Sequence, residues 1–100
     1  MLYVVVPAYN EADNLVELIP TIHERVCELD PDGKVLVVDD GSTDETKTVM
    51  TDLAEKYDGV SVLSSRRNRG KAAALKSGFD LALEGGATEI AMMDADGQDD

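Results

Sequence analysis

Four short apolar runs, separated by three segments of helical periodicity, constrain the fold of this chain more than any other feature. Residues 2–6 and 35–38 are nearly continuous aliphatic runs, and residues 60–63 and 90–93 are shorter ones. Runs of this kind are typical of strands that are covered on both faces. Each intervening segment is long enough for a right-handed crossover between parallel strands. We therefore expect an α/β fold, with three Rossmann-like α/β/α layers around an open parallel sheet of about four strands.

The segments between these runs carry apolar residues at spacings of three and four, which is typical of amphipathic helices. Pro20 lies inside the first segment and is expected to kink the helix or to restart it. Ser42 and Glu45 fit a capping box that predicts the start of the second helix. The third helix is predicted to begin near Gly70 and to stop at Gly85. The residues expected to face the core from the first and third helices are Leu15, Leu18, Ile19, Ile22, Val26, Leu29, Ala72, Leu75, Phe79, Ala82 and Leu83.

The charge balance and the single cysteine exclude several classes of function. Twenty-one Asp and Glu residues against nine Lys and Arg give a formal net charge of −12, which disfavours binding to nucleic acid or anionic lipid. Cys27 alone forms no intramolecular disulfide and no cysteine-built zinc site. No apolar run approaches the roughly 20 residues of a spanning helix, and the first residues lack signal-peptide features. We therefore expect residues 1–100 to be one cytoplasmic globular domain with no membrane span and no nucleic-acid partner; the oligomeric state is left open.

Unusual residues gather in the four segments that follow the predicted strands. In open parallel sheets, ligands bind beyond the carboxyl ends of the strands, near a switch in strand order. Residues 7–11, 39–44, 64–71 and 94–100 are expected to form that rim. The third segment holds four of the nine basic residues, beside two acidic segments. The sequence therefore predicts one charged ligand-binding rim.

Two acidic motifs on this rim each allow two interpretations. Asp94 and Asp96 are two residues apart, so both carboxylates would project to one side of an extended strand exit. With the neutral oxygen of Gln98 they could hold Mg²⁺ or Mn²⁺, or the segment could be a solvated acidic tail. Asp39 and Asp40 leave a buried strand on opposite faces. One could stabilise the amides of a helix start while the other accepts from a nucleobase N–H, or both could cap helices.

The remaining candidates also have a functional and a structural interpretation. The basic cluster at residues 66–71 precedes a helix start, which favours phosphate, but it could be a surface patch that balances nearby acid. Tyr9 offers a ring for stacking on a base, or belongs to the core. His23 and Cys27 are four residues apart and could be a metal pair, although packing or surface placement is favoured because no further soft ligands are apparent.

Four stretches, in order, resemble successive blocks of family-two glycosyltransferases of the GT-A fold. They are residues 4–11 (VVVPAYNE), 37–44 (VVDDGSTD), 68–74 (NRGKAAA) and 93–98 (MDADGQ). Within the family, the chain is most similar to dolichyl-phosphate mannose synthases and related polyprenyl-phosphate glycosyltransferases. The resemblance covers essentially the whole chain and implies the N-terminal, nucleotide-sugar-binding half of a GT-A fold, as a truncated glycosyltransferase domain.

The resemblance also implies roles for individual residues. Asp94 and Asp96 match the DXD motif and, with Gln98, would hold Mg²⁺ or Mn²⁺ against the donor diphosphate, with Asp96 as the catalytic residue. Arg69 is expected near the nucleotide. The residues implied for nucleotide binding are Pro7, Tyr9, Glu11, Val38, Asp40, Lys71, Asp94 and Ala95.

The implied activity is the metal-dependent, inverting transfer of a hexose from GDP-mannose or a UDP-sugar to a polyprenyl or dolichyl phosphate or a glycan. The family's acceptor site would lie beyond residue 100, so the chain alone is expected to be inactive; a longer parent would act at the cytoplasmic face of a membrane. A non-catalytic nucleotide-binding fragment shares these motifs and stays an alternative. An acidic receiver-like signalling module is a weaker alternative, because residues 63–65 lack the aspartate that such a module needs.

Overall fold

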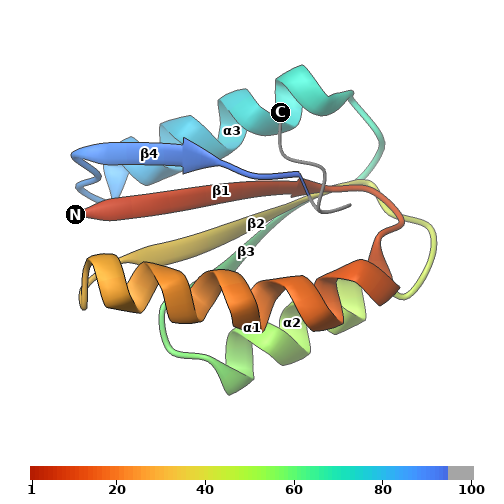
Figure 1. Cartoon of the computed structure of the whole chain (residues 1–100). Coiled ribbons are helices and arrows are strands. Elements are labelled where there is room, and N and C mark those ends of the chain that lie inside the picture. Colours follow the sequence, from red (N-terminus) through yellow and green to blue (C-terminus); the bar gives the residue numbers. More distant parts are fainter. Residues whose placement is uncertain (95–100) are drawn as a thin grey trace.

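The computed structural model describes residues 1–94, which alternate strand and helix as predicted. The elements are β1 (Leu2–Ala8), α1 (Ala12–Leu29), β2 (Lys34–Asp40), α2 (Thr46–Lys56), β3 (Val60–Ser65), α3 (Lys71–Glu84) and β4 (Glu89–Met92). All four strands are parallel and lie in the order β3-β2-β1-β4. Helices α1 and α2 cover one face of the sheet and α3 covers the other (Figure 1). The predicted three-layer α/β/α architecture is confirmed.

The strand order places a topological switch between β1 and β4. β1, β2 and β3 are neighbours in chain order, whereas β4 lies on the other side of β1. In the register, Val5 of β1 pairs with Leu36 of β2 on one side and with Met92 of β4 on the other. The helix that follows β1 and the helix that precedes β4 lie on opposite faces (Figure 1). The carboxyl ends of β1 and β4 are therefore the place where a ligand is expected.

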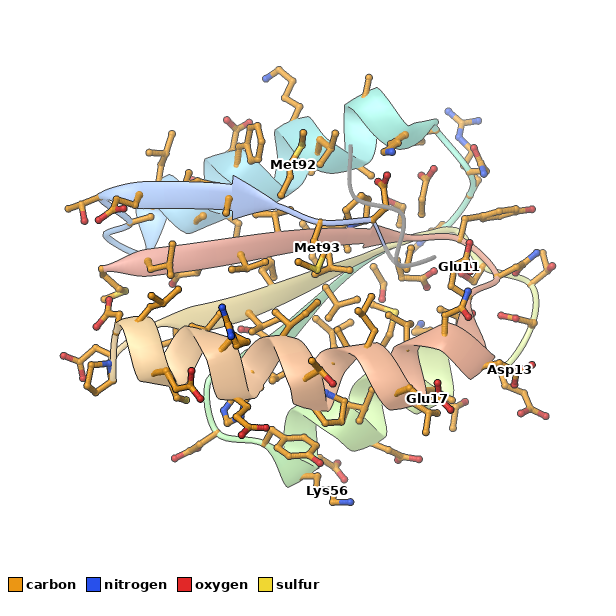
Figure 2. All side chains as sticks on the ribbon, in the orientation of Figure 1. Glu11, Asp13, Glu17, Lys56, Met92 and Met93 are labelled. Carbon is orange, nitrogen blue, oxygen red and sulfur yellow. The ribbon has the colours of Figure 1, made fainter. Side chains whose placement is uncertain are left out.

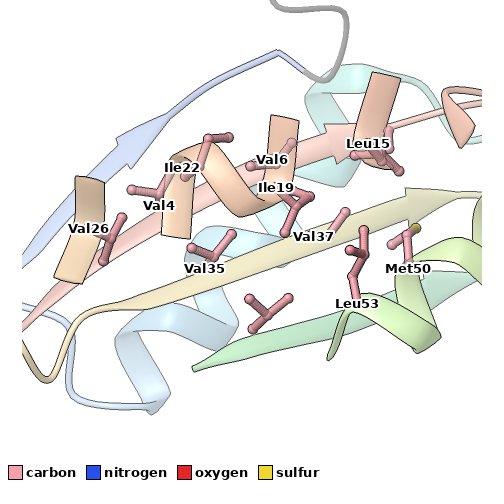
Figure 3. Close-up of a cluster of buried hydrophobic side chains, with 12 residues drawn as sticks. Val4, Val6, Leu15, Ile19, Ile22, Val26, Val35, Val37, Met50 and Leu53 are labelled. Atoms are coloured by element: carbon pink, nitrogen blue, oxygen red, sulfur yellow. The ribbon is translucent and has the colours of Figure 1, made fainter. Parts of the chain in front are cut away.

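The larger part of the core lies between the sheet and helices α1 and α2 (Figure 3). Val4 and Val6 of β1 and Val35 and Val37 of β2 point into it and meet side chains such as Ile19 of α1. The strand residues between them face α3 instead. Since successive side chains of a strand point to opposite faces, a strand covered on both sides is apolar throughout. This accounts for the aliphatic runs in the sequence.

β4 forms one edge of the described sheet, as predicted. The side chain of Met92 is 54% exposed, whereas Met93, directly after the strand, packs against the larger core. The two side chains point to opposite sides of the sheet (Figure 2). Within residues 1–94, no helix combines the length and the apolar character that crossing a bilayer requires.

Helix α3 packs unusually close to the sheet at Gly78. A Cβ atom on this glycine would lie 2.6 Å from Cγ1 of Val5 and 3.0 Å from Cγ2 of Val38. Both valines are fully buried, so neither can move aside without disturbing the smaller core. The glycine therefore sets the distance between α3 and the two central strands.

We expect Gly78→Val to lower the free energy of unfolding by about 1–3 kcal/mol, because overpacking a filled core forces strain on its neighbours. Urea denaturation checks this. Ala72→Val is the matched control, since it places the same side chain at an exposed position of α3. Helix propensity alone would stabilise the Gly78→Val protein, because valine is a better helix former than glycine. It would slightly destabilise the Ala72→Val protein, because valine is a poorer helix former than alanine. A Gly78→Val protein as stable as the Ala72→Val protein would contradict the close packing.

The predicted cap of the second helix differs from the structure, and so does one of the two expectations for Pro20, that it restarts the first helix. The capping box is wrong: α2 begins at Thr46 and has no side-chain N-cap. The Ser42 hydroxyl instead accepts a hydrogen bond of 3.0 Å from the backbone N–H of Asn10, so a tertiary contact takes the place of the cap. Pro20 does not restart the first helix, because α1 is continuous from Ala12 to Leu29.

The prediction that Leu29, Ala72 and Leu83 face the core is also wrong. Leu29 is 73% exposed and Leu83 is 61% exposed, and Ala72 is exposed as well. The buried face of α3 consists of Ala74, Gly78 and Ala82. These three small residues are spaced four positions apart along one side of the helix. Leu83 directly follows Ala82, so it is turned by about 100° to another side. Leu29 is the last residue of α1.

Candidate functional site

The carboxyl ends of β1 and β2, the start of α3 and the second residue after β4 line a pocket of about 180 Å³. The residues that line this pocket are Pro7, Ala8, Tyr9, Glu11, Asp40, Lys71 and Asp94. All of them except Ala8 are residues that the family resemblance implies for nucleotide binding. Glu11 marks this end of the sheet in Figure 2. The pocket therefore lies at the switch between β1 and β4, and we call it the donor pocket.

Asp40 holds the loop between β3 and α3 against the end of β2. Its side chain is nearly buried, with 4% of the residue exposed. One carboxylate oxygen, Oδ1, accepts a hydrogen bond of 2.9 Å from the backbone N–H of Arg69, and Oδ2 accepts one of 3.0 Å from that of Gly70. A carboxylate oxygen can accept more than one hydrogen bond. Asp40 can therefore fix the loop and still face a ligand in the donor pocket.

Asp39 has a different role from Asp40, as predicted from the fact that adjacent side chains of a strand point to opposite faces of the sheet. It is 2% exposed, and its Oδ1 accepts a hydrogen bond of 2.9 Å from the backbone N–H of Ser42. This contact shapes the loop between β2 and α2. The two aspartates thus order two different loops from adjacent positions of one strand.

Asn10 joins the loop after β1 to the loop after β2, a role that the sequence analysis did not find. Its side-chain Oδ1 accepts hydrogen bonds from the backbone N–H groups of Thr43, at 2.8 Å, and Asp44, at 3.2 Å. Its backbone φ is +52°, in the left-handed region that asparagine tolerates better than most residues. This tolerance is the signal that could have identified it. Because Asn10 lies between Tyr9 and Glu11, its bonds hold two lining residues of the donor pocket.

A second contact between the same loops involves Thr46, the first residue of α2. The backbone N–H of Glu11 donates a hydrogen bond of 2.8 Å to the Thr46 hydroxyl. That hydroxyl in turn donates to Oδ1 of Asp44. Thr46 is fully buried, whereas Asp44 at the end of this chain is exposed. The position of Glu11 is therefore set by α2 as well as by α1, which begins at the next residue.

Lys71 and Asp94 place opposite charges in direct contact in the donor pocket. The Lys71 Nζ forms an ion pair with Oδ1 of Asp94, and their side chains are 57% and 23% exposed. Lys71 is the first residue of α3, and Asp94 comes directly after Met93 at the exit of β4. Exposed ion pairs contribute little to stability. What this pair supplies is a cation and a carboxylate at the point where β4 ends.

Other predicted site residues lie elsewhere. Val38 is fully buried in the core beneath α3 and does not line the donor pocket. Ala95, Asp96 and Gln98 lie outside the described residues. Over residues 1–94, no three His, Cys, Asp or Glu side chains are arranged to hold a metal ion.

His23 and Cys27 favour the packing interpretation. Nε2 of His23 lies 2.7 Å from the carbonyl oxygen of Asp58, and the imidazole is tilted against the ring of Tyr57, with centroids 5.3 Å apart. Sγ of Cys27 is 3.6 Å from the same Nε2. The imidazole thus serves to join α1 to the turn before β3.

A wider hollow of about 730 Å³ lies between the starts of α1 and α2. Its lining includes four carboxylates and no basic residue; these acids are Glu11, Asp13, Asp44 and Glu45. Such a lining repels phosphate. The donor pocket, with Lys71, is the better site for a nucleotide.

Two carboxyl groups have lowered pKa values, which predicts a stability loss in acid. The Thr46 hydroxyl and then the Thr46 backbone N–H hold the pKa of Asp44 below its usual 3.8. The backbone N–H groups of Leu2 and Asp32 lower the pKa of Asp30 in the same way. The unfolded chain therefore binds protons more readily, so stability present above a pH of about 4 is lost as the pH falls through the folded-state pKa values.

Urea denaturation between about pH 5 and pH 2 tests this sign. We expect Asp44→Asn to flatten the fall in stability, because the amide keeps an oxygen acceptor for Thr46 but does not titrate. Asp52→Asn removes the same charge from an exposed position of α2 and serves as the control. An unchanged pH profile in the Asp44→Asn protein would show that the hydrogen bonds of Asp44 do not influence folding.

Comparison with known proteins identifies the family. The sequence model described as "Glycosyl transferase family 2" matches residues 3–100. The chain belongs to glycosyl transferase family 2. This membership excludes the receiver-like alternative.

Relatives in the family are considerably longer than this chain. A polyprenol monophosphomannose synthase of Mycolicibacterium smegmatis is 41% identical over 95 residues, which cover 94% of this chain and 34% of the relative. A dolichyl-phosphate beta-glucosyltransferase of Trichomonas vaginalis is 34% identical over 98 residues, covering 93% and 29%. Among solved structures, a mannosyltransferase from Pyrobaculum calidifontis in complex with GDP-Man and Mn²⁺ superposes with a TM-score of 0.79 and 33% identity, covering 95% of this chain and 27% of that one. The chain thus spans 27–34% of the length of these three proteins.

Proposed function

We propose that residues 1–100 form the nucleotide-sugar-binding domain of a hexosyltransferase that uses GDP-mannose or a UDP-sugar. The observation that carries this proposal is the donor pocket. It gathers side chains from the carboxyl ends of β1 and β2 and from the segments after β1 and β4, at the switch point of the sheet, together with Lys71. The similarity to a mannosyltransferase solved with GDP-Man and Mn²⁺ supports the same class of ligand.

Each lining residue suits a part of such a donor. Tyr9 is 42% exposed at the pocket, so its ring is available for stacking on a base. Asp40 is already fixed by two backbone N–H groups and can accept from a ring N–H of the base. Lys71 brings a positive charge that favours the diphosphate.

The side-chain oxygen atoms of the proposed metal ligands also suit Mg²⁺ or Mn²⁺, which prefer oxygen ligands. Asp94 presents its carboxylate to the pocket and already pairs with the ammonium group of Lys71, so its position favours a cation. Asp94, Asp96 and Gln98 are the residues we propose to hold the metal. When bound, the metal would supply Lewis-acid stabilisation of the diphosphate leaving group. We keep Asp96 as the proposed catalytic residue and Ala95 and Val38 as proposed nucleotide contacts.

The acceptor proposed from the sequence is a polyprenyl or dolichyl phosphate or a glycan, with inversion at the anomeric carbon. The names of two relatives contain polyprenol monophosphomannose or dolichyl phosphate, which supports the lipid phosphate. A phosphate oxygen is ionised at neutral pH, so its attack needs no strong general base. A cytoplasmic location belongs to the same proposal and agrees with the free, exposed thiol of Cys27.

Nucleotide binding and sugar transfer are tested separately. Titration calorimetry with GDP and UDP should show binding that strengthens with Mn²⁺. Incubation with GDP-mannose or UDP-glucose, Mn²⁺ and a polyprenyl phosphate should give no efficient transfer by the 100 residues alone. Binding without transfer also fits the non-catalytic alternative. The same transfer assay on a protein extended to the length of its relatives would distinguish the two, because the non-catalytic alternative predicts no transfer by the extended protein either. Absence of binding to either nucleotide would contradict the proposed function, and efficient transfer would contradict the expected inactivity.

A further inference from the structure

A third charged hollow lies at the opposite edge of the sheet from β4. It has a volume of about 420 Å³ and is bounded by the end of β3, the loop that follows it and α3. The residues that line this hollow are Leu63, Ser64, Ser65, Arg66, Arg67, Arg69 and Ser77. It shares no lining residue with the donor pocket. We call it the arginine hollow.

The charge of this hollow is opposite to that of the protein. The chain has a net charge of −12 and only four arginines, and three of the four line the hollow. Within residues 1–94, the ion pairs are those of Lys71 with Asp94 and of Lys76 with Asp80, so no described carboxylate pairs with these three guanidinium groups. Like charges that are close together repel one another. A direct ion pair with a described carboxylate therefore does not account for the cluster.

The backbone that carries the arginines is held in place from the side of β2. Asp40 accepts hydrogen bonds from the backbone N–H groups of Arg69 and Gly70. Gly41 packs so closely on the loop that a Cβ atom there would lie 2.2 Å from the carbonyl carbon of Arg67. A loop fixed in this way loses less conformational entropy when a ligand binds to its side chains.

We propose that the arginine hollow binds the phosphate group of an anionic ligand, at a site separate from the donor pocket. A guanidinium group offers paired N–H donors that match two phosphate oxygens, and the hydroxyls of Ser65 and Ser77 add further donors. The overall negative charge of the protein opposes general attraction to anions. Binding therefore has to come from this local set of donors. Free phosphate and a phospholipid headgroup share the required chemistry.

The test uses amide chemical shifts of the ¹⁵N-labelled chain during titration with inorganic phosphate, with chloride at equal ionic strength as the reference. We expect saturable shifts at Ser65, Arg66, Arg67 and Ser77 with phosphate only. Arg66→Gln/Arg67→Gln should weaken the apparent affinity about tenfold or more, as expected when charged hydrogen bonds are lost. Arg66→Lys/Arg67→Lys keeps the charge but removes the paired donors, and should weaken it to an intermediate extent.

Lys47→Gln/Lys56→Gln is the matched control, because it removes two positive charges from exposed positions of α2. It should leave phosphate affinity within about twofold. Sedimentation with phosphatidylglycerol vesicles, with phosphatidylcholine vesicles as the reference, distinguishes the two sources of the phosphate group. Vesicle binding that depends on Arg66 and Arg67 identifies a lipid headgroup. Chemical-shift changes with inorganic phosphate, without vesicle binding, identify a small phosphate ligand. Neither response, or equal loss in the lysine control, would overturn the proposal.

A GDP titration separates this inference from the proposed function. Arg66→Gln/Arg67→Gln should bind GDP with Mn²⁺ as the unchanged chain does, since neither arginine lines the donor pocket. Loss of GDP binding in this variant would show that the two hollows form one site and would overturn the proposal. Failure of the unchanged chain to bind GDP would contradict only the proposed function.

Discussion

Replacing Asp40 by alanine is expected to lower the free energy of unfolding by about 2–4 kcal/mol, since hydrogen bonds to a charged group contribute about 1.5–3 kcal/mol each. The carboxylate is nearly buried and accepts from the backbone N–H groups of Arg69 and Gly70. Alanine leaves both N–H groups without this partner. Asp40→Asn should have a smaller effect, because one oxygen acceptor stays while the new amide N–H₂ faces a second donor. Urea denaturation measures the loss.

The Asp40→Ala variant should also lose nucleotide binding, because Asp40 lines the donor pocket and fixes the loop that leads to Lys71. Calorimetry with GDP and Mn²⁺ measures this loss under conditions in which the variant is still folded. Asp52→Ala removes an equal charge from an exposed position of α2 and should change stability by no more than about 0.5 kcal/mol. If Asp40→Ala were as stable as Asp52→Ala, the two hydrogen bonds would not hold the loop.

Much of the fold follows from local patterns in the sequence. The aliphatic runs at β1 and β2 are continuous because both faces of these strands are covered, one by α1 and α2 and the other by α3. Parallel strands bring their carboxyl ends to one edge of the sheet. The strand pattern was therefore enough to place residues 7–11, 39–44 and 64–71 on one rim. The family resemblance selected Pro7, Tyr9, Glu11, Asp40 and Lys71 from these segments, and all five line the donor pocket.

What the sequence did not predict depends on contacts between distant segments. Ser42 and Glu45 match a helix cap, but the Ser42 hydroxyl bonds to Asn10, which is 32 positions earlier. A capping pattern considers only neighbours in the chain, so it cannot include such a competitor. The partners of Asp40 likewise lie 29 and 30 positions later, in a different loop.

Gly41→Ala is expected to be the second strongly destabilising change, with a loss of about 2–4 kcal/mol from two separate causes. The backbone φ of Gly41 is +74°, which costs an alanine about 1–2 kcal/mol. In addition, its Cβ would lie 2.2 Å from the carbonyl carbon of Arg67 and 2.4 Å from the backbone nitrogen of Asn68. Backbone atoms cannot turn aside as a flexible side chain can. The loops after β2 and β3 would therefore have to separate.

Gly86→Ala isolates the first cause, the strain of a positive φ. Gly86 has a φ of +92°, but a Cβ there would meet nothing within 4 Å, so this variant carries the backbone strain without the collision. It should lose only about 1–2 kcal/mol. The amide shifts of residues 66–70 should move in the Gly41→Ala protein and stay in place in the Gly86→Ala protein. Because the same segment carries the bonds of Asp40 and the backbone of the arginine hollow, Gly41→Ala should also weaken GDP and phosphate binding together. Equal stability losses in the two alanine variants, with unchanged shifts at residues 66–70, would show that the two loops are not in contact.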